Sequence, residues 1–287
     1  MIRQERAVRR RRFRRNILEI NALKAQCTLV RRDIISMLAK AGSGHPGGSL
    51  SAVEILVALY GNVMNVKAQD PHNAHRDRFV LSKGHAAPAL YGVLAENGFF
   101  PKEELSHLRQ LGAMLQGHPD MNRCPGVDAS TGSLGQGVSI AVGMALGARL
   151  GGGSEHVYTL LGDGESQEGL VWEALMAAAH YKLDNLTVIF DWNGLQIDGR
   201  NDDVMSLGDF PAKLRAFGLD LIEVADGNDL EQVLAALQAP ACPGKPRGIL
   251  CHTLKGKGVS FMEDQAGWHG KAPIAAQAET ALKELEG

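Results

Sequence analysis

Two polar side chains, Asp163 and Asn193, lie 30 residues apart, and each closely follows a short apolar run. The runs, His156–Leu161 and Leu186–Phe190, have the length and the aliphatic content of buried strands. A carboxylate and an amide oxygen are hard ligands that suit Mg²⁺, which completes its coordination with phosphate oxygens and water. Glycines on both sides of Asp163 let a bulky anion approach the backbone. The pattern therefore predicts a Mg²⁺–diphosphate site; the alternative is a tight turn in which Asp163 only caps a helix.

Histidines form the second group with catalytic potential, because four of the ten lie in loops rich in glycine or proline. These are His45, His85, His118 and His269. Imidazole can hold, donate or accept a proton near neutral pH, and a sugar substrate offers several hydroxyls that need this service. The rival is a zinc site at His72 and His75, whose spacing suits a metal, although no cysteine lies near them.

The elements that position these residues follow from periodicity. Between the two apolar runs, Glu168–Leu183 carries apolar residues at helical spacing, which predicts a strand–helix–strand unit with parallel strands. Asp163 and Asn193 then emerge at the carboxyl ends of strands, where open α/β sheets bind ligands. Further strands are expected at Asp77–Leu81, Asp220–Val224 and Gly248–Thr253. The pattern predicts an α/β fold: one doubly wound parallel sheet with helices on both faces.

Further helices are expected outside this unit, with Ser49 and Asn228 as candidate caps and Asp198–Met205 as a surface loop. Their expected ranges are Asn16–Lys40, Leu50–Leu59, Ala87–Asn97, Pro101–Leu111, Val138–Leu150, Phe210–Phe217, Asp229–Leu237 and Ala275–Leu285.

Composition narrows the class of protein. The 287 residues are 45% hydrophobic, enough for one large α/β domain, and the net charge of −2 gives no argument for nucleic acid or membrane as a partner. No apolar stretch reaches the roughly 18 residues of a membrane span. The four cysteines form no CxxC pair, which favours reduced thiols and a cytoplasmic setting. Residues 1–15 are rich in arginine without a following apolar segment, so we expect a disordered basic extension, or alternatively an arm on a partner, before a binding domain at 16–287.

The spacing of Gly162-Asp163-Gly164 and Asn193 resembles the thiamine diphosphate motif. More specifically, Gly162–Gly169 and Asn193–Gly199 resemble transketolase, and the similarity runs from about Leu29 to His269. It covers only the first half of a conventional transketolase. The resemblance implies a thiamine diphosphate (PP-type) binding domain with thiamine diphosphate and Mg²⁺ as cofactors, Ca²⁺ or Mn²⁺ being substitutes for the metal.

The resemblance also implies roles for individual residues. The implied metal ligands are Asp163, Asn193 and the carbonyl of Leu195. The implied cofactor contacts are His85, Gly132, Leu134, Asp163, Gly164, Asn193, Ile197 and His269. The implied catalytic set is His45, His85, His118 and His269, which line the substrate channel, and Glu168, an acid at the subunit contact.

Transketolases activate the cofactor with a glutamate from a separate pyrimidine-binding domain, for which this chain has no room. We therefore expect the diphosphate-binding subunit of a two-chain transketolase, active only with a C-terminal partner subunit in a heterotetramer of two copies each. The reaction implied is transfer of a two-carbon ketol unit from a ketose donor to an aldose acceptor, with sugar phosphates as substrates. A fragment of a longer protein is the plainer alternative.

Two other functions stay open at this point. One is half of a deoxyxylulose-phosphate-synthase-like thiamine diphosphate enzyme, which would use pyruvate as donor. The other is a non-catalytic diphosphate-binding module, against which the intact Asp163 and Asn193 pair and the loop histidines argue. A nicotinamide dinucleotide fold is disfavoured, because the next glycine, Gly169, does not match the fingerprint spacing. The sequence leaves open which sugars are used.

Overall fold

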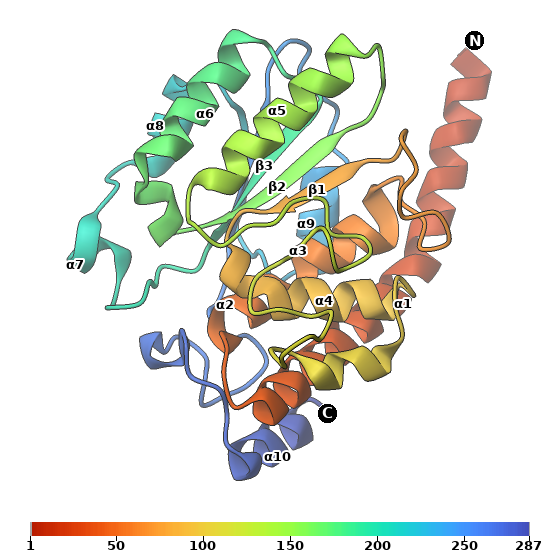
Figure 1. Ribbon diagram of the computed structural model, residues 1–287. Helices are drawn as coiled ribbons and strands as arrows, with labels where there is room; N and C mark the ends of the chain where they lie inside the picture. The colour runs from red at the N-terminus through yellow and green to blue at the C-terminus, as the bar shows by residue number, and fades with distance from the viewer. Residues whose placement is uncertain (1, 287) are drawn as a thin grey trace.

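The computed structural model describes residues 2–286, with side chains from residue 20 onward. Five parallel strands form one sheet in the order β1-β2-β3-β5-β4 (Figure 1). Their bounds are Arg78–Leu81 (β1), Val157–Gly162 (β2), Leu186–Trp192 (β3), Asp220–Val224 (β4) and Arg247–His252 (β5). All five expected strands and their parallel arrangement are confirmed.

Helices cover both faces of the sheet, as the fold class predicts (Figure 1). One face carries α1 (Ile2–Ala41), α3 (Val53–Ala58), α4 (Ala87–Glu96) and α9 (Leu230–Leu237). The other carries α5 (Gln136–Leu150), α6 (Gly169–His180) and α8 (Phe210–Ala216). Of the remaining helices, α2 (Pro46–Leu50) and α7 (Asn201–Met205) lie by the loops at the carboxyl edge, and α10 (Ala275–Glu284) packs on α1. Short 3₁₀ helices at Gly84–Ala86, Lys102–His107, Gly164–Gln167 and Ala266–Trp268 and a π-helical turn at Leu59–Val63 complete the chain.

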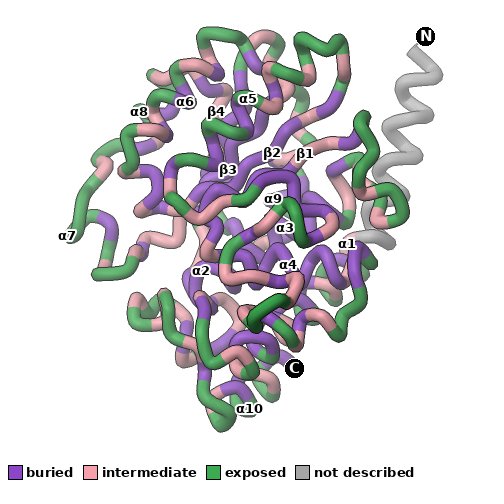
Figure 2. Tube along the Cα trace, viewed as in Figure 1, coloured by how far each residue is buried: buried purple, intermediate pink, exposed green. Residues whose placement is uncertain are grey.

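Two hydrophobic cores lie on opposite faces of the sheet, because alternate strand residues point to opposite sides. Leu160 of β2 and Ile189 of β3 join the core under α1, α3, α4 and α9. Their neighbours Leu161 and Phe190 join the core under α5, α6 and α8. Strands β1, β2, β3 and β5 run through the buried centre of the molecule (Figure 2), whereas the edge strand β4 is buried only at Val224. This double burial explains why β2 and β3 are largely continuous apolar runs instead of alternating ones.

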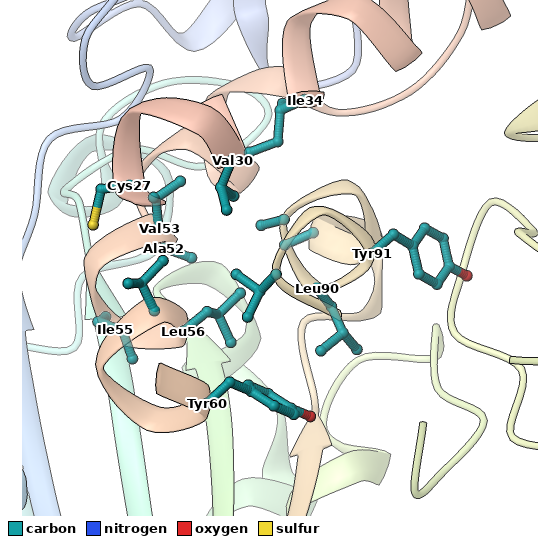
Figure 3. Packing of buried hydrophobic residues seen from close by; sticks show 14 of the residues in the cluster. Cys27, Val30, Ile34, Ala52, Val53, Ile55, Leu56, Tyr60, Leu90 and Tyr91 are labelled. Carbon is teal, nitrogen blue, oxygen red and sulfur yellow. The ribbon is translucent and has the colours of Figure 1, made fainter. Parts of the chain in front are cut away.

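The first core is dense where three helices meet. Val30 and Ile34 of α1 face Leu56 of α3 and Leu90 of α4, whereas the ring of Tyr91 points away from this group toward a neighbouring loop (Figure 3). The Tyr91 side chain is buried all the same. It therefore belongs to the boundary between the core and the loop that carries His118.

Four details of the helices differ from expectation. Pro46 begins α2, so Ser49 is not a cap but lies inside that helix, and its hydroxyl donates to the carbonyl of His45 at 2.6 Å. Asp229, not Asn228, caps α9 by accepting from the backbone of Glu231.

The stretch expected as helix Pro101–Leu111 holds only the short 3₁₀ helix, since Arg109 adopts a left-handed φ of 62°. The segment expected as a surface loop at Asp198–Met205 contains α7, which a buried Asn201 anchors.

The bounds of α1 take in the arginine-rich residues for which the sequence suggests a disordered extension. The side chains of that stretch lie outside the described residues, so its role stays a prediction. Among residues 2–286, no helix is both long and apolar enough to cross a membrane.

Candidate functional site

A cavity of about 350 Å³ opens at the carboxyl edge of the sheet, among the loops that follow β1, β2, β3 and β5. With the exception of His118, every site residue expected from the sequence lines it. They are His45, His85, Gly132, Leu134, Asp163, Gly164, Glu168, Asn193, Leu195, Ile197 and His269. The cavity also takes in residues that the sequence did not single out, namely Gly48, Lys83, Glu165, Gln167 and Gln196.

Asp163 is fixed in position directly after β2 and is buried. Its Oδ2 accepts hydrogen bonds from the backbone N–H of Gly194 at 2.6 Å and from Nδ2 of Asn201 at 2.8 Å. Burial, reinforced by the nearby charge of Asp191, raises the pKa of Asp163 to about 6. Because both bonds use Oδ2, Oδ1 is the oxygen that can bind a cation without breaking either bond.

The donor set suits a hard divalent cation. Asn193 contributes an amide oxygen, Oδ1, which also accepts from the N–H of Leu195 at 3.2 Å. The carbonyl of Leu195 already attracts positive charge, since Nζ of Lys255 lies 3.3 Å from it. Burial lowers the pKa of this ammonium to about 8. One carboxylate, one amide and one carbonyl oxygen are ligands of the kind that Mg²⁺ takes together with phosphate oxygens, so the residues fit the implied metal.

Three of the predicted histidines form a cluster over the cavity. The ring centroids of His45, His85 and His269 lie 5.3, 5.4 and 5.1 Å apart in pairs. Burial lowers the pKa of His45 to about 4 and, with the charge of Lys255, that of His269 to about 3. Burial and then Lys83 lower the pKa of His85 as well. The three imidazoles are therefore neutral near pH 7 and can both donate and accept hydrogen bonds.

One atom of this cluster points to a ligand. Nδ1 of His45 is buried and has no hydrogen-bond partner within the described part of the chain. A buried imidazole nitrogen without a partner is costly, so a bound polar group would relieve it.

His118 lies beside the cavity, next to one of its walls. A Cβ built on Gly132 would come within 3.1 Å of its imidazole ring, so the two residues are in contact. The hydroxyl of Tyr91 lies 3.0 Å from the carbonyl oxygens of both Gln116 and His118, which anchors this loop to α4. Burial and then the charge of Arg109 lower the pKa of His118.

Glu165 ties three loops of the site together. Its buried carboxylate accepts from the backbone N–H of Gly135 at 2.9 Å, from that of Gly162 at 3.1 Å and from the hydroxyl of Ser82. These donors come from the segment before α5, the end of β2 and the end of β1. Glu165 therefore holds the segment before α5, which contains Leu134, against the strand end that carries Asp163.

Two glycines allow the loop after β1 to approach the segment leading into α5. A Cβ on Gly84 would lie 2.8 Å from the backbone nitrogen of Gly132, and one on Gly137 would lie 2.6 Å from the Cα of Ser82. Both contacts involve backbone atoms, which cannot move aside as a side chain can. The width of the cavity thus depends on close backbone packing.

Glu168 and Ile197 lie at the open side of the site. Glu168 is exposed at the start of α6, and the Ile197 side chain is 65% exposed although it lines the cavity. Both side chains therefore lie where this chain leaves the cavity open.

The sequence missed several residues of the site. Lys83, Asp191 and Asn201 are buried polar groups whose partners lie far away along the chain, so no local spacing marks them. Lys83 had one available signal, since it lies between a strand and His85. Lys255, from a basic glycine-rich segment after β5, also lines the cavity. In the described residues no group of three His, Cys, Asp or Glu side chains could hold a metal, and His75 pairs with Glu155 at 2.9 Å, which leaves the zinc alternative without support.

The chain matches the family model described as "Transketolase, thiamine diphosphate binding domain" over residues 23–287. It is 41% identical over 269 residues to one of the subunits of apulose-4-phosphate transketolase from Phocaeicola vulgatus, covering 93% of this chain and 95% of that protein. It is 43% identical over 265 residues to the 6-deoxy-6-sulfo-D-fructose transketolase subunit SqwG of a Clostridium species, covering 92% and 96%.

Longer relatives match with only part of their length. Human transketolase is 42% identical over 271 residues, which cover 93% of this chain but 42% of that protein. The crystal structure of transketolase from Campylobacter jejuni superposes with a TM-score of 0.86 at 32% identity, covering 92% of this chain and 42% of that one. The chain thus spans about two fifths of the length of the longer transketolases it matches.

Proposed function

The chain belongs to the transketolase family as a thiamine diphosphate binding domain, and from this premise we propose that it is the diphosphate-binding subunit of a two-chain transketolase. With a partner, it transfers a two-carbon ketol unit from a ketose donor to an aldose acceptor. The thiazolium of the bound cofactor supplies the carbanion chemistry, as cofactors do for reactions that side chains cannot perform.

One observation carries the proposal. The cavity at the carboxyl edge gathers Asp163, Asn193 and the Leu195 carbonyl on one side and three neutral histidines on another. The first group offers oxygen ligands for a metal that holds a diphosphate, and the second offers proton donors and acceptors for sugar hydroxyls.

Different residues of this chain would hold the metal, the cofactor and the sugar. Asp163 Oδ1, Asn193 Oδ1 and the Leu195 carbonyl would hold Mg²⁺, and Gly164 lets the diphosphate approach the backbone. His85 and His269 would contact the cofactor, while His45 and His118 would orient and move hydroxyl protons of the sugar. Their lowered pKa values keep these imidazoles neutral near pH 7, so each retains a ring nitrogen that can accept a hydrogen bond from a hydroxyl.

A second subunit is required under this proposal. Two similar proteins of nearly the same length are named as transketolase subunits, and the longer transketolases carry more than twice this length. The partner would supply the pyrimidine-binding domain and its glutamate, in a heterotetramer of two copies each. Glu168, exposed beside the cavity, would lie at the subunit contact.

The sugars stay open within the class. The names of the two relatives of similar length refer to a sugar phosphate and to a sulfonated sugar. We propose a ketose with an anionic terminus as donor.

The decisive experiment compares the purified chain alone with the chain plus its partner. Calorimetry should show binding of thiamine diphosphate that depends on Mg²⁺, and turnover of a ketose phosphate donor should appear only after the partner is added. Full turnover by the single chain would contradict the two-chain proposal. Use of pyruvate in place of the ketose would instead favour a deoxyxylulose-phosphate-synthase-like enzyme.

A further inference from the structure

A buried ammonium lies in the wall of the cavity, between its two groups of functional residues. Lys83 follows β1 and is 1% exposed, yet it lines the cavity together with His85 and Asp163. Its Nζ donates to Oδ2 of Asp191, the last but one residue of β3. A lysine is almost never buried this completely without a functional or structural partner.

Asp191 holds this ammonium in one place. The carboxylate is fully buried and accepts from the hydroxyl of Ser51 at 2.6 Å on Oδ2 and from the hydroxyl of Thr253 on Oδ1. The partners come from the segment after α2 and the segment after β5. Because Asp191 lies on the central strand β3 and is held by two hydroxyls, its carboxylate is fixed in position opposite the ammonium of Lys83.

The residues around Lys83 direct its remaining N–H donors toward the cavity. A Cβ on Gly48 would lie 3.4 Å from Nζ of Lys83 and 3.5 Å from Nε2 of His85, so the ammonium and the imidazole approach the same spot. The lysine stem passes over Gly162, where an added Cβ would be 3.6 Å from its Cδ. Lys83 therefore reaches from the strand end that carries Asp163 toward the histidine cluster.

An ammonium has three donors, and the described residues supply one acceptor, Asp191. Burying a charge whose donors are only partly paired is unfavourable, so an anionic ligand in the cavity would stabilise the buried ammonium of Lys83. A diphosphate carries more negative charge than one divalent cation neutralises. The position beside His85 and Asp163 is where that excess would lie.

We propose that Lys83 binds the diphosphate of the cofactor directly and that Asp191 is the positioning residue that aims its ammonium. The inference rests on the proposed function, since it names a further residue for the same cofactor. It differs from the metal ligands in kind: Lys83 recognises the anion and not the cation.

The test separates anion binding from metal binding in the full-length chain. Lys83→Met keeps the length of the side chain and removes the charge. Binding of Mg²⁺ with thiamine diphosphate, and of Mg²⁺ with inorganic pyrophosphate, should weaken roughly 10- to 100-fold in calorimetry, the range for a lost charged hydrogen bond. Binding of Mn²⁺ alone, followed by the electron paramagnetic resonance of the free ion, should stay within about 2-fold of wild type, since the metal ligands are untouched.

Controls address folding and nonspecific charge. Lys83→Met leaves Asp191 buried without its cation, so the double variant Lys83→Met/Asp191→Asn should regain thermal stability while keeping the weak diphosphate binding. Lys213→Met removes one charge from the exposed face of α8 and should bind as wild type does.

Two outcomes would overturn the inference. Wild-type affinity for both diphosphate ligands in the double variant would show that Lys83 does not touch the anion, and an equal loss of Mn²⁺ and diphosphate binding would show a purely structural role. A wild-type chain that binds neither diphosphate ligand would instead contradict the proposed function itself.

Discussion

The side-chain amide of Asn201 donates a 2.8 Å hydrogen bond to Oδ2 of Asp163. Asn201 belongs to α7, a helix that follows the segment with Asn193 and Leu195, so one short helix helps to fix the orientation of the Asp163 carboxylate, the proposed metal ligand. Partners of this kind, which orient a ligand without touching the metal, commonly change metal affinity by about 10- to 100-fold when removed.

Asn201→Ala should therefore weaken Mg²⁺-dependent binding of thiamine diphosphate about 10-fold, because Asp163 loses one of the two bonds that orient it. Calorimetry on the purified chain measures the change. Asp203→Ala, an exposed residue of the same helix, is the matched control and should bind normally. An unchanged affinity in Asn201→Ala would mean that the Gly194 N–H alone orients the carboxylate.

Asp163→Ala should abolish Mg²⁺-dependent binding of the cofactor, since Asp163 is the charged member of the proposed metal ligands. Because the carboxylate is buried and its pKa is raised, removing it should not destabilise the metal-free chain strongly. The thermal midpoint of the variant, measured without metal, checks this second point. Micromolar affinity retained in the complex with the partner would overturn the metal assignment.

Tyr91→Phe should reproduce the effect of removing His118. The substitution deletes the hydroxyl that lies 3.0 Å from the His118 carbonyl, and the loop then loses its tie to α4. We expect a roughly 10-fold lower turnover in the two-chain complex, a stability loss of about 1 kcal/mol and little change in cofactor affinity. His118→Ala is the comparison variant, and an equal loss of turnover and cofactor affinity in either variant would indicate a structural defect.

The surroundings of Asp33, which lies far from the site, predict that the stability of the folded chain depends on pH. It lies on α1 and faces Glu96 of α4 and Lys102, whose Nζ is 3.4 Å from Oδ2 of Asp33. Burial, with a hydrogen bond that the protonated Asp33 donates to Glu96, raises the pKa of Asp33 from 3.8 to about 7. The folded chain thus holds this proton more tightly than the unfolded chain, and the stability it contributes is complete below pH 3.8 and is lost as the pH rises through about 7.

Asp33→Asn keeps the side chain neutral at every pH and should flatten this part of the profile. Scanning calorimetry between about pH 5 and pH 8 should show that the midpoint of the variant falls less with rising pH than that of the wild type. Asp203→Asn, exposed on α7, serves as the charge-matched control. Parallel profiles for Asp33→Asn and wild type would refute the prediction.

The sheet and the placement of Asp163 and Asn193 at its carboxyl edge could be predicted because their signals are local. Each strand is a short apolar run, and Asp163 and Asn193 follow two of these runs directly. Parallel pairing of β2 and β3 then brings their carboxyl ends together by geometry alone. The histidines were found because several of them share the same kind of loop, and three of them do cluster.

The supporting residues could not be predicted because their signals are long-range. Asp191 contacts Ser51, Lys83 and Thr253, which lie up to 140 positions away along the chain. None of these four residues stands out by its amino-acid type from its neighbours in the sequence. The polar neighbours of Asn201 predict a surface loop, although its own side chain is buried against Asp163. A single buried polar residue carries no periodicity, so only the folded chain reveals it.

The close backbone packing at Gly84 and Gly137 has a consequence for how this sequence can change. Any side chain at either position meets backbone atoms at less than 3 Å, so no compensating substitution nearby can make room. Gly143 and Gly147 on α5 have nothing within 4 Å of such a side chain. Sequence drift in the isolated chain is therefore blocked at the first pair and open at the second, although all four positions carry the same amino acid.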